Sequence, residues 1–205
     1  MKTDTMNRVF RYIVTSCFLV LAACGSSPAV HYYALEATGN YVAQDDEGSP
    51  VMAVGGFRMP EYLNRSQFVT RGSGAEIIVD DVNRWAEPLD DAIHRVLATN
   101  LDILLESMVV VAYPAAAITE ADYRLIGRFD GFVSGPDGRV DLRVQWAITG
   151  PDGTVLLPAR RARFESQAAN PDDPGSIAQA MSDVLAQYSR AVAAEVESIG
   201  LAQAR

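Results

Sequence analysis

Thiol groups are scarce in this chain, which has only two cysteines among 205 residues. Cys17 lies within an apolar stretch near the start, and Cys24 lies just after that stretch. Because no cysteine follows Cys24, the rest of the chain has no internal disulfide and no catalytic thiolate. A zinc site built on several thiolates is excluded for the same reason.

Positive charge is also scarce. The chain has 17 Lys and Arg against 26 Asp and Glu, which gives a net charge of −9. Three of the positive charges, Lys2, Arg8 and Arg11, precede Cys24, so the remainder is more acidic than the whole chain. Such a body is a poor match for nucleic acid, and anionic lipid headgroups repel it. Surface charge would therefore not hold it at a membrane.

A hydrophobic run long enough to cross a bilayer is missing at the start. The apolar stretch from Tyr12 to Ala23 has 12 residues, whereas a bilayer core needs about 20. Basic residues before it and small residues after it indicate a secretory signal peptide rather than a transmembrane anchor. An ordinary secretion signal with a chance cysteine is the other alternative.

The last residues of this segment, Leu21-Ala22-Ala23-Cys24, resemble the lipobox of bacterial lipoproteins. In such proteins the leader is cut before the cysteine, which is acylated. The resemblance implies a cleaved leader over residues 1–23, lipidation at Cys24 and a tether over residues 24–30. More than one acyl chain makes membrane attachment stable.

The remaining residues predict a single α+β domain over 31–200. Apolar side chains alternate with others from Val140 to Ile148, as in a half-buried antiparallel strand. Gly-Pro-Asp-Gly turns at 135–138 and 150–153 predict hairpins on both sides of it. Helical spacing of apolar residues predicts one helix after Pro88 and a second that ends near Gly200. Further strands are expected at 31–35, 51–57, 67–70, 76–80, 109–113, 123–133, 154–157 and 160–165. We expect an antiparallel or mixed sheet with both amphipathic helices on one face.

Residue types that support catalysis do not converge in the sequence. His31 lies among strand-forming residues, and His94 lies at the edge of a helix's apolar stripe. Neither a Gly-x-Ser-x-Gly nor a His-Glu-x-x-His motif occurs. Adjacent carboxylates at 45–46, 80–81, 90–91 and 172–173 are typical of solvated or capping groups. We therefore expect no enzyme, no metal site and no cofactor.

Several motifs occur in the order and with the gaps found in ABC-type transport auxiliary lipoproteins. The chain resembles this family from about His31 to Ile199. The segments that carry the resemblance are Tyr32-Tyr33-x-Leu35, then 59–71 beginning Met59-Pro60-Glu61-Tyr62-Leu63-Asn64, then Arg84-Trp85-Ala86-Glu87-Pro88-Leu89, 95–101, 122–125 and 128–130.

The resemblance implies a periplasm-facing lipoprotein, generally of the outer membrane, without enzymatic activity. Members work with an MCE-domain protein and an inner-membrane ABC transporter or permease, and these systems move phospholipids or other hydrophobic molecules between membranes. The lipoprotein would dock the MCE assembly at the outer membrane. Gly25 favours outer-membrane sorting, since an aspartate there resembles an inner-membrane retention signal. Some relatives form rings, so the resemblance also admits a homo-oligomer.

Arginines near aromatic residues mark candidate contacts. Arg, Tyr and Trp are enriched where proteins bind each other. We expect Tyr62, Leu63 and Arg65 to contact a partner at the surface, and Trp85 and Leu89 to belong partly to the core. Core packing and salt bridging are the alternatives for the arginines of this region. The competing function is a lipoprotein that assembles outer-membrane components or binds the cell wall.

Overall fold

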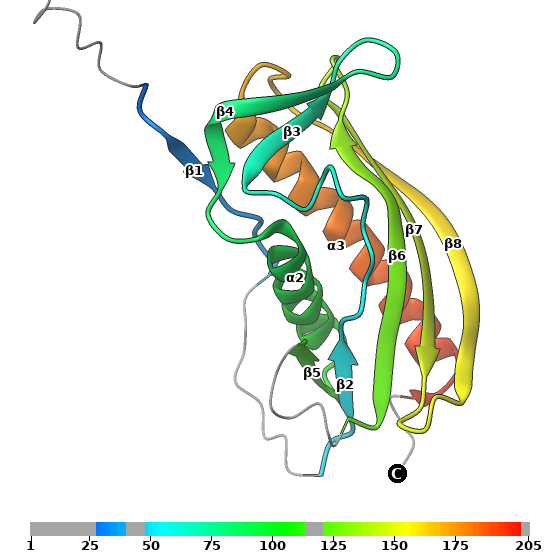
Figure 1. Ribbon diagram of the computed structural model, residues 1–205. Coiled ribbons are helices and arrows are strands. Elements are labelled where there is room, and N and C mark those ends of the chain that lie inside the picture. Colours follow the sequence, from blue (N-terminus) through cyan, green and yellow to red (C-terminus); the bar gives the residue numbers. More distant parts are fainter. Residues whose placement is uncertain (1–27, 40–47, 114–120, 202–205) are drawn as a thin grey trace, which may run out of the picture. The chain divides into compact units, whose positions relative to one another are not determined.

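The computed structural model describes residues 28–39, 48–113 and 121–201. His31 begins a compact unit that contains all the strands and helices named below. The unit combines a mixed sheet of eight strands with two helices, which confirms the predicted α+β class (Figure 1). Within the described residues, no helix has both the length and the apolar character needed to span a membrane.

Three long strands form the curved wall of this unit. They are β6 (Tyr123–Ser134), β7 (Arg139–Thr149) and β8 (Val155–Gln167), and they pair antiparallel in chain order. The two Gly-Pro-Asp-Gly turns join them as predicted. Gly138 and Gly153 in these turns have φ values of 77° and 86°, which glycine adopts without steric cost. Burial alternates along β7 from residue 140 to residue 148, so its pattern is confirmed.

The other edge of β6 carries two groups of short strands, one near each end. The first group is β2 (Val51–Val54), parallel to both β6 and β5 (Val109–Ala112). The second group is β3 (Gln67–Arg71), antiparallel β4 (Ile77–Trp85), and β1 (His31–Tyr33), which runs parallel to β4 at the sheet edge. The sheet is therefore mixed because both groups pair with β6 in parallel.

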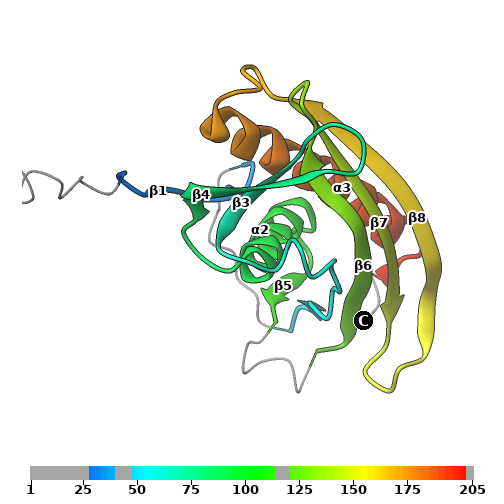
Figure 2. The same ribbon diagram turned by 45° about the horizontal axis from the view of Figure 1, so that its top comes forward.

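Both helices lie inside the curve of the long strands, on one face as predicted, and they also pack against each other (Figure 2). They are α2 (Leu89–Leu104) and α3 (Pro174–Ser198). The side chain of Asp173 caps α3, since its two oxygens accept from Gly175 N and Ser176 N, each at 3.1 Å. These bonds satisfy amides that a helix start otherwise leaves unpaired.

The centre of the core is an aromatic cluster around Tyr188 of α3. The ring centroid of Tyr188 lies 5.3 Å from that of Trp146, 5.9 Å from Phe164, 6.2 Å from Phe129 and 6.4 Å from Phe57. Its hydroxyl is buried and has no hydrogen-bond partner among the described residues. Burial raises the pKa of Tyr188 well above its ordinary value.

Several expectations about element boundaries are wrong. The strands expected at 31–35 and 51–57 end at Tyr33 and Val54. The segments 154–157 and 160–165 form one strand. Pro158 does not interrupt it, because β8 lies at the sheet edge and its pairing with β7 shifts register at this residue. The shift lies between the pairs Ile148–Leu157 and Trp146–Arg160. The strand expected to end at 80 continues to Trp85, where it pairs with β1. The second helix ends at Ser198, and Ile199 just after it is 38% exposed.

Candidate functional site

Three motif segments that are far apart in the sequence meet through backbone hydrogen bonds. Ala86 N donates to Tyr33 O at 2.8 Å, and Trp85 N donates to Ser66 O at 2.7 Å. In the sheet register, Tyr32 of β1 lies beside Arg84 of β4, which lies beside Gln67 of β3. Three of the segments that carry the family resemblance therefore lie side by side at the β1 end of the sheet.

A hollow of about 470 Å³ lies where these segments meet, and we call it the motif hollow. The ring of Trp85, which is 4% exposed, stacks on Phe68 with centroids 4.5 Å apart. Tyr32, by contrast, is 64% exposed. The lining of the motif hollow therefore includes both a buried aromatic residue, Trp85, and an exposed one, Tyr32. Its lining consists of Tyr32, Asn64, Arg65, Ser66, Arg84, Trp85, Ala86, Glu87 and Pro88.

The turn before β3 positions the predicted partner-contact residues. Leu63 N donates to Pro60 O at 2.9 Å and Asn64 N donates to Glu61 O at 3.1 Å. This tight turn directs the Leu63 side chain inward, where it is 2% exposed and belongs to the core. The expectation that Leu63 lies at the surface is therefore wrong: local composition did not show which way the turn rotates its side chains. Tyr62 is half-buried and Arg65 is exposed, so the partner contact of these two stays a prediction.

The remaining sequence predictions at this end have mixed outcomes. Trp85 and Leu89 are 4% and 2% exposed, so their place in the core is confirmed. Cys24 lies outside the described residues, as does the predicted leader. Arg84 and Tyr32 were not singled out as site residues, although both stand in segments that carry the family resemblance. Their register across β1 and β4 is what brings them together.

The charges around the motif hollow are unevenly compensated. Glu87 pairs with Arg95 at 2.5 Å, and Arg95 Nη2 also donates to Leu35 O at 2.9 Å. Arg65 and Arg84 make no side-chain hydrogen bond or ion pair with any residue that the structure describes, and the Nε of Arg84 is buried without a partner there. The motif hollow therefore holds two guanidinium groups whose charge its described surroundings leave unneutralised.

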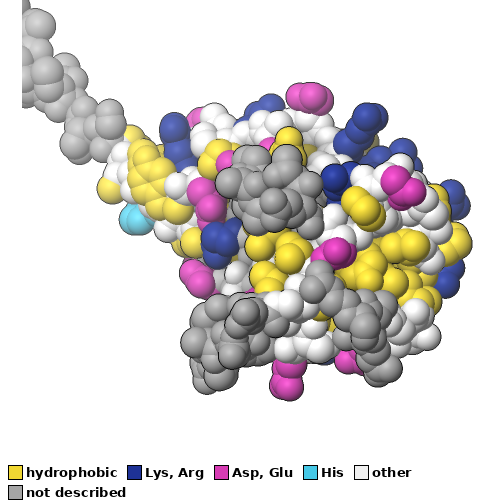
Figure 3. All heavy atoms as spheres, turned by 90° about the horizontal axis from the view of Figure 1, so that it is seen from below, with side chains coloured by type: hydrophobic (Ala, Val, Ile, Leu, Met, Phe, Trp, Pro, Cys, Tyr) yellow, Lys and Arg dark blue, Asp and Glu magenta, His cyan; other side chains and the backbone are white. Residues whose placement is uncertain are grey.

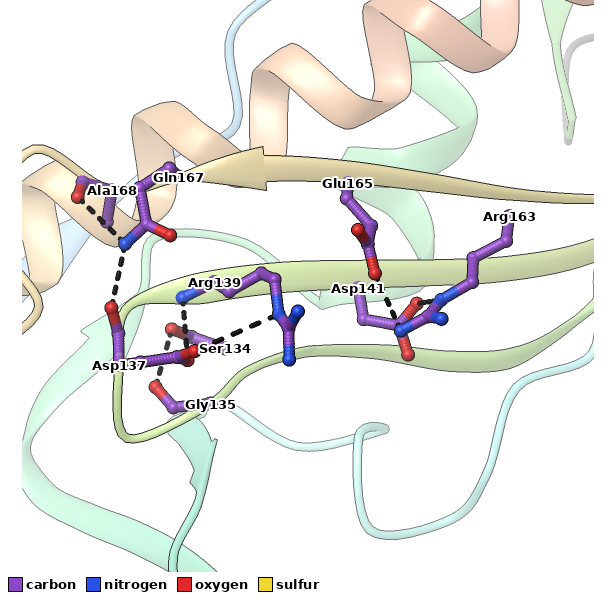
Figure 4. A network of polar contacts seen from close by, with 9 residues as sticks. All are labelled: Ser134, Gly135, Asp137, Arg139, Asp141, Arg163, Glu165, Gln167 and Ala168. Atoms are coloured by element: carbon purple, nitrogen blue, oxygen red, sulfur yellow. Dashed lines mark hydrogen bonds and ion pairs between the residues drawn. The ribbon is translucent and has the colours of Figure 1, made fainter.

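A second arginine-rich surface lies where β8 flanks the β6–β7 hairpin (Figure 4). Arg163 Nε lies 2.6 Å from Asp141 Oδ1, and Arg163 Nη2 lies 2.6 Å from Glu165 Oε1. The hydrogen bond to Asp141 raises the pKa of Arg163. Gln167 Nε2 donates to Asp137 O at 2.7 Å and so ties β8 to the turn. Unlike Arg65 and Arg84, Arg163 is compensated by its neighbours, so this network has a structural role.

Exposed apolar side chains gather at another face. Figure 3 looks at the lower end of Figure 1 and shows hydrophobic side chains spread over this end. Exposed large apolar residues at the ends of α2, β8 and α3 are Leu104, Val155, Leu156 and Ile199, at 37%, 59%, 37% and 38% exposure. Leu104 also lines a hollow with Glu197. The same hollow is lined by Glu106 and Ser107, so this face combines apolar contact area with carboxylate groups.

The histidines and paired carboxylates have structural surroundings. His31 is exposed on β1, whereas His94 is 8% exposed inside α2. Burial lowers the pKa of His94, and Asp90 and Asp91 oppose this shift. Burial acts to raise the pKa of Asp80, but its carboxylate accepts from the side-chain amide of Asn83 and from the backbone amides of residues 83 and 82, and these bonds together lower the pKa. Within the parts of the chain that the structure describes, no group of three or more potential ligands could hold a metal ion.

Comparisons with known proteins agree with the motifs. The chain is 23% identical over 191 residues to the intermembrane transport lipoprotein PqiC of Escherichia coli K12. The aligned region covers 92% of this chain and 98% of that protein. PqiC of Shigella flexneri matches equally well. A crystal structure of an uncharacterized protein superposes with a TM-score of 0.68 at 23% identity, over 82% of this chain and 99% of that one. Protein XCC0632 of Xanthomonas campestris superposes at 0.64 with 16% identity, over 83% and 97%. These two structures support the fold.

The family described as ABC-type transport auxiliary lipoprotein component matches residues 33–193. The match covers most of the chain and includes two of the segments that meet at the motif hollow, 64–66 and 84–88, whereas Tyr32 lies just before it. The chain belongs to this family of transport auxiliary lipoproteins.

Proposed function

We propose that this protein is an outer-membrane-anchored, periplasm-facing lipoprotein that serves an intermembrane lipid transport system. In this role, acyl chains on Cys24 hold the body at the outer membrane, and the body docks an MCE-domain protein that an inner-membrane ABC transporter or permease drives. The protein acts by position and contact, and it catalyses no reaction. Family membership and the PqiC likeness support the transport role.

The observation that carries the proposal is that three of the family motif segments meet at the motif hollow. Leu35, Trp85 and Leu89 from these motifs are buried, so part of the resemblance reflects folding. Tyr32 and Arg65 are exposed, so packing does not explain why these residue types stand there. Exposed aromatic and arginine side chains at one place are typical of protein contact sites. We assign Arg65 to the partner contact on this basis, together with the half-buried Tyr62, which lies three residues before it in the same turn region.

Site-specific photo-crosslinking in intact cells tests the docking role. A photoreactive amino acid replaces Tyr62 in one variant and Arg161, an exposed residue of β8, in a matched control. We expect the probe at position 62 to capture an MCE-domain protein and the probe at position 161 to capture little. Capture of outer-membrane assembly factors or cell-wall material alone, at both positions, would favour the competing function and contradict docking.

The anchor has a separate test. Intact mass spectrometry of the native protein should show a chain that begins at Cys24 and carries acyl groups, and Cys24→Ala should leave the protein outside the outer-membrane fraction. A native chain that retains residues 1–23, or carries an unmodified Cys24, would refute the anchoring.

A further inference from the structure

We propose that the motif hollow binds the phosphate group of a phospholipid headgroup between the guanidinium groups of Arg65 and Arg84. The inference rests on the proposed membrane anchoring, because that anchoring brings the motif hollow to a phospholipid surface. It goes beyond docking, since it assigns the protein a lipid contact of its own.

The first argument is the state of the two arginines. Arg84 is half-buried, and neither its guanidinium nor that of Arg65 has a polar partner among the described residues. Taking a charged group partly out of water is costly unless it is paired. Arg95, whose partner Glu87 lines the motif hollow, shows the usual solution, because the two side chains form an ion pair. An external anion would complete the same arrangement for Arg84.

The second argument is the chemistry of the lining. Guanidinium groups bind phosphate through two parallel hydrogen bonds, and two of them converge here from different elements. Asn64 and Ser66 add further polar side chains to the same lining. Tyr32, beside Arg84 in the sheet register, is 64% exposed. A tyrosine with an apolar ring and a polar tip is favoured where a membrane meets water.

The third argument is reach. Tyr32 lies eight positions after Cys24, and a fully extended chain over eight positions spans at most about 29 Å. Once Cys24 is acylated, Tyr32 cannot lie farther than this from the site of attachment. Headgroup phosphates are then the most concentrated phosphates within reach. The net negative charge of the body disfavours anionic lipids at long range, so the zwitterionic headgroup of phosphatidylethanolamine is the expected ligand.

The test uses the acylated full-length mature protein in liposomes. A photoreactive amino acid replaces Ser66, which is exposed and lines the motif hollow. The liposomes consist of a phosphate-free galactolipid into which phosphatidylethanolamine is added stepwise, and intact mass spectrometry measures the protein–lipid adduct. We expect a saturable phospholipid adduct and little galactolipid adduct.

Variants in the same background locate the binding groups. Arg84→Gln and Arg65→Gln should each shift half-maximal adduct formation to at least about tenfold more phosphatidylethanolamine, since each removes a charge-assisted hydrogen-bonding group. Arg161→Gln, an equal change of charge at an exposed arginine on β8, should leave it unchanged. Because Arg65 is exposed, its variant keeps the test valid even if Arg84→Gln folds poorly.

Three outcomes overturn the proposal. These are absence of a phospholipid adduct, equal adduct formation in all variants, and loss of the adduct when inorganic phosphate is added, which would identify a free-phosphate site instead. The liposomes contain no partner protein, so this result does not depend on docking. If the probe at position 62 captures no MCE-domain protein but the probe at position 66 forms a phospholipid adduct, docking alone is rejected. If the probe at position 62 captures an MCE-domain protein but no phospholipid adduct forms at position 66, the headgroup site alone is rejected.

Discussion

We predict that removal of the buried hydroxyl of Tyr188 stabilises the protein. The side chain is completely buried in the aromatic cluster, and its oxygen has no partner among the described residues. An unsatisfied buried polar group costs about 1–3 kcal/mol. Tyr188→Phe keeps the ring and its contacts with Trp146 and Phe164. We therefore expect the free energy of unfolding to rise by about 1 kcal/mol or more.

The ring of Tyr188 should have the opposite effect when it is removed. Its faces and edges contact Phe57 and Phe129 as well as Trp146 and Phe164, and truncation leaves a cavity among them. Replacing a large buried aromatic side chain by alanine costs about 3–5 kcal/mol. Tyr188→Ala should therefore lower the free energy of unfolding by this amount, so that one position gives effects of both signs.

Urea unfolding monitored by circular dichroism measures both effects. Tyr32→Phe is the matched control, because the same hydroxyl is removed from a side chain that is 64% exposed. Its effect should stay within about 0.5 kcal/mol. If Tyr188→Phe instead destabilises the protein by about 1 kcal/mol or more, the hydroxyl is hydrogen-bonded inside the core and the reasoning fails.

Three further predictions concern local features. Asp173→Ala removes both cap bonds of α3 and should lower the free energy of unfolding by about 0.5–2 kcal/mol; in urea titrations, an unchanged midpoint would contradict the cap. Gly127→Ala should destabilise the protein far more than Gly131→Ala. A Cβ at position 127 would collide with the backbone oxygen of Gln145, whereas one at position 131 would meet only the flexible guanidinium end of Arg143. Equal melting temperatures of the two variants would refute this. Burial lowers the pKa of His94 below 6.5, so at mildly acidic pH the unfolded state binds more protons at this residue than the folded state does. Stability should thus fall as the pH drops below about 6.5, and His94→Leu should flatten this slope between neutral and mildly acidic pH; parallel curves for both proteins would show that other groups cause it.

Local chemistry explains which elements could be read in advance. The hairpins around β7 follow from Gly-Pro-Asp-Gly turns, in which the aspartate oxygens of Asp137 and Asp152 accept from the amides two residues later. The start of α3 follows from Asp173 and the proline after it. Each of these signals lies within a few residues of its own structural consequence, so the pattern suffices to predict it.

Other features depend on residues far apart in the chain. The β8 strand can contain Pro158 because its outer edge has no neighbouring strand in the described sheet. No local sequence pattern indicates this edge position. The direction of Leu63 depends on the core that α2 and the sheet together provide. Arg84 looked like one of several arginines near aromatic residues, and only the pairing of β4 with β1 and β3 places it beside Tyr32 and near Arg65.

The amino-acid sequence by itself determined the class of fold, the positions of both helices and the family, because alternation, helical spacing, turn residues and motif order are properties of neighbouring positions. The tertiary structure alone decided which strands run parallel, which motif side chains are buried, and that two arginines without described partners share one hollow. These depend on pairing between segments up to about seventy residues apart, and such pairing is set by the packing of the whole core rather than by any single stretch of chain.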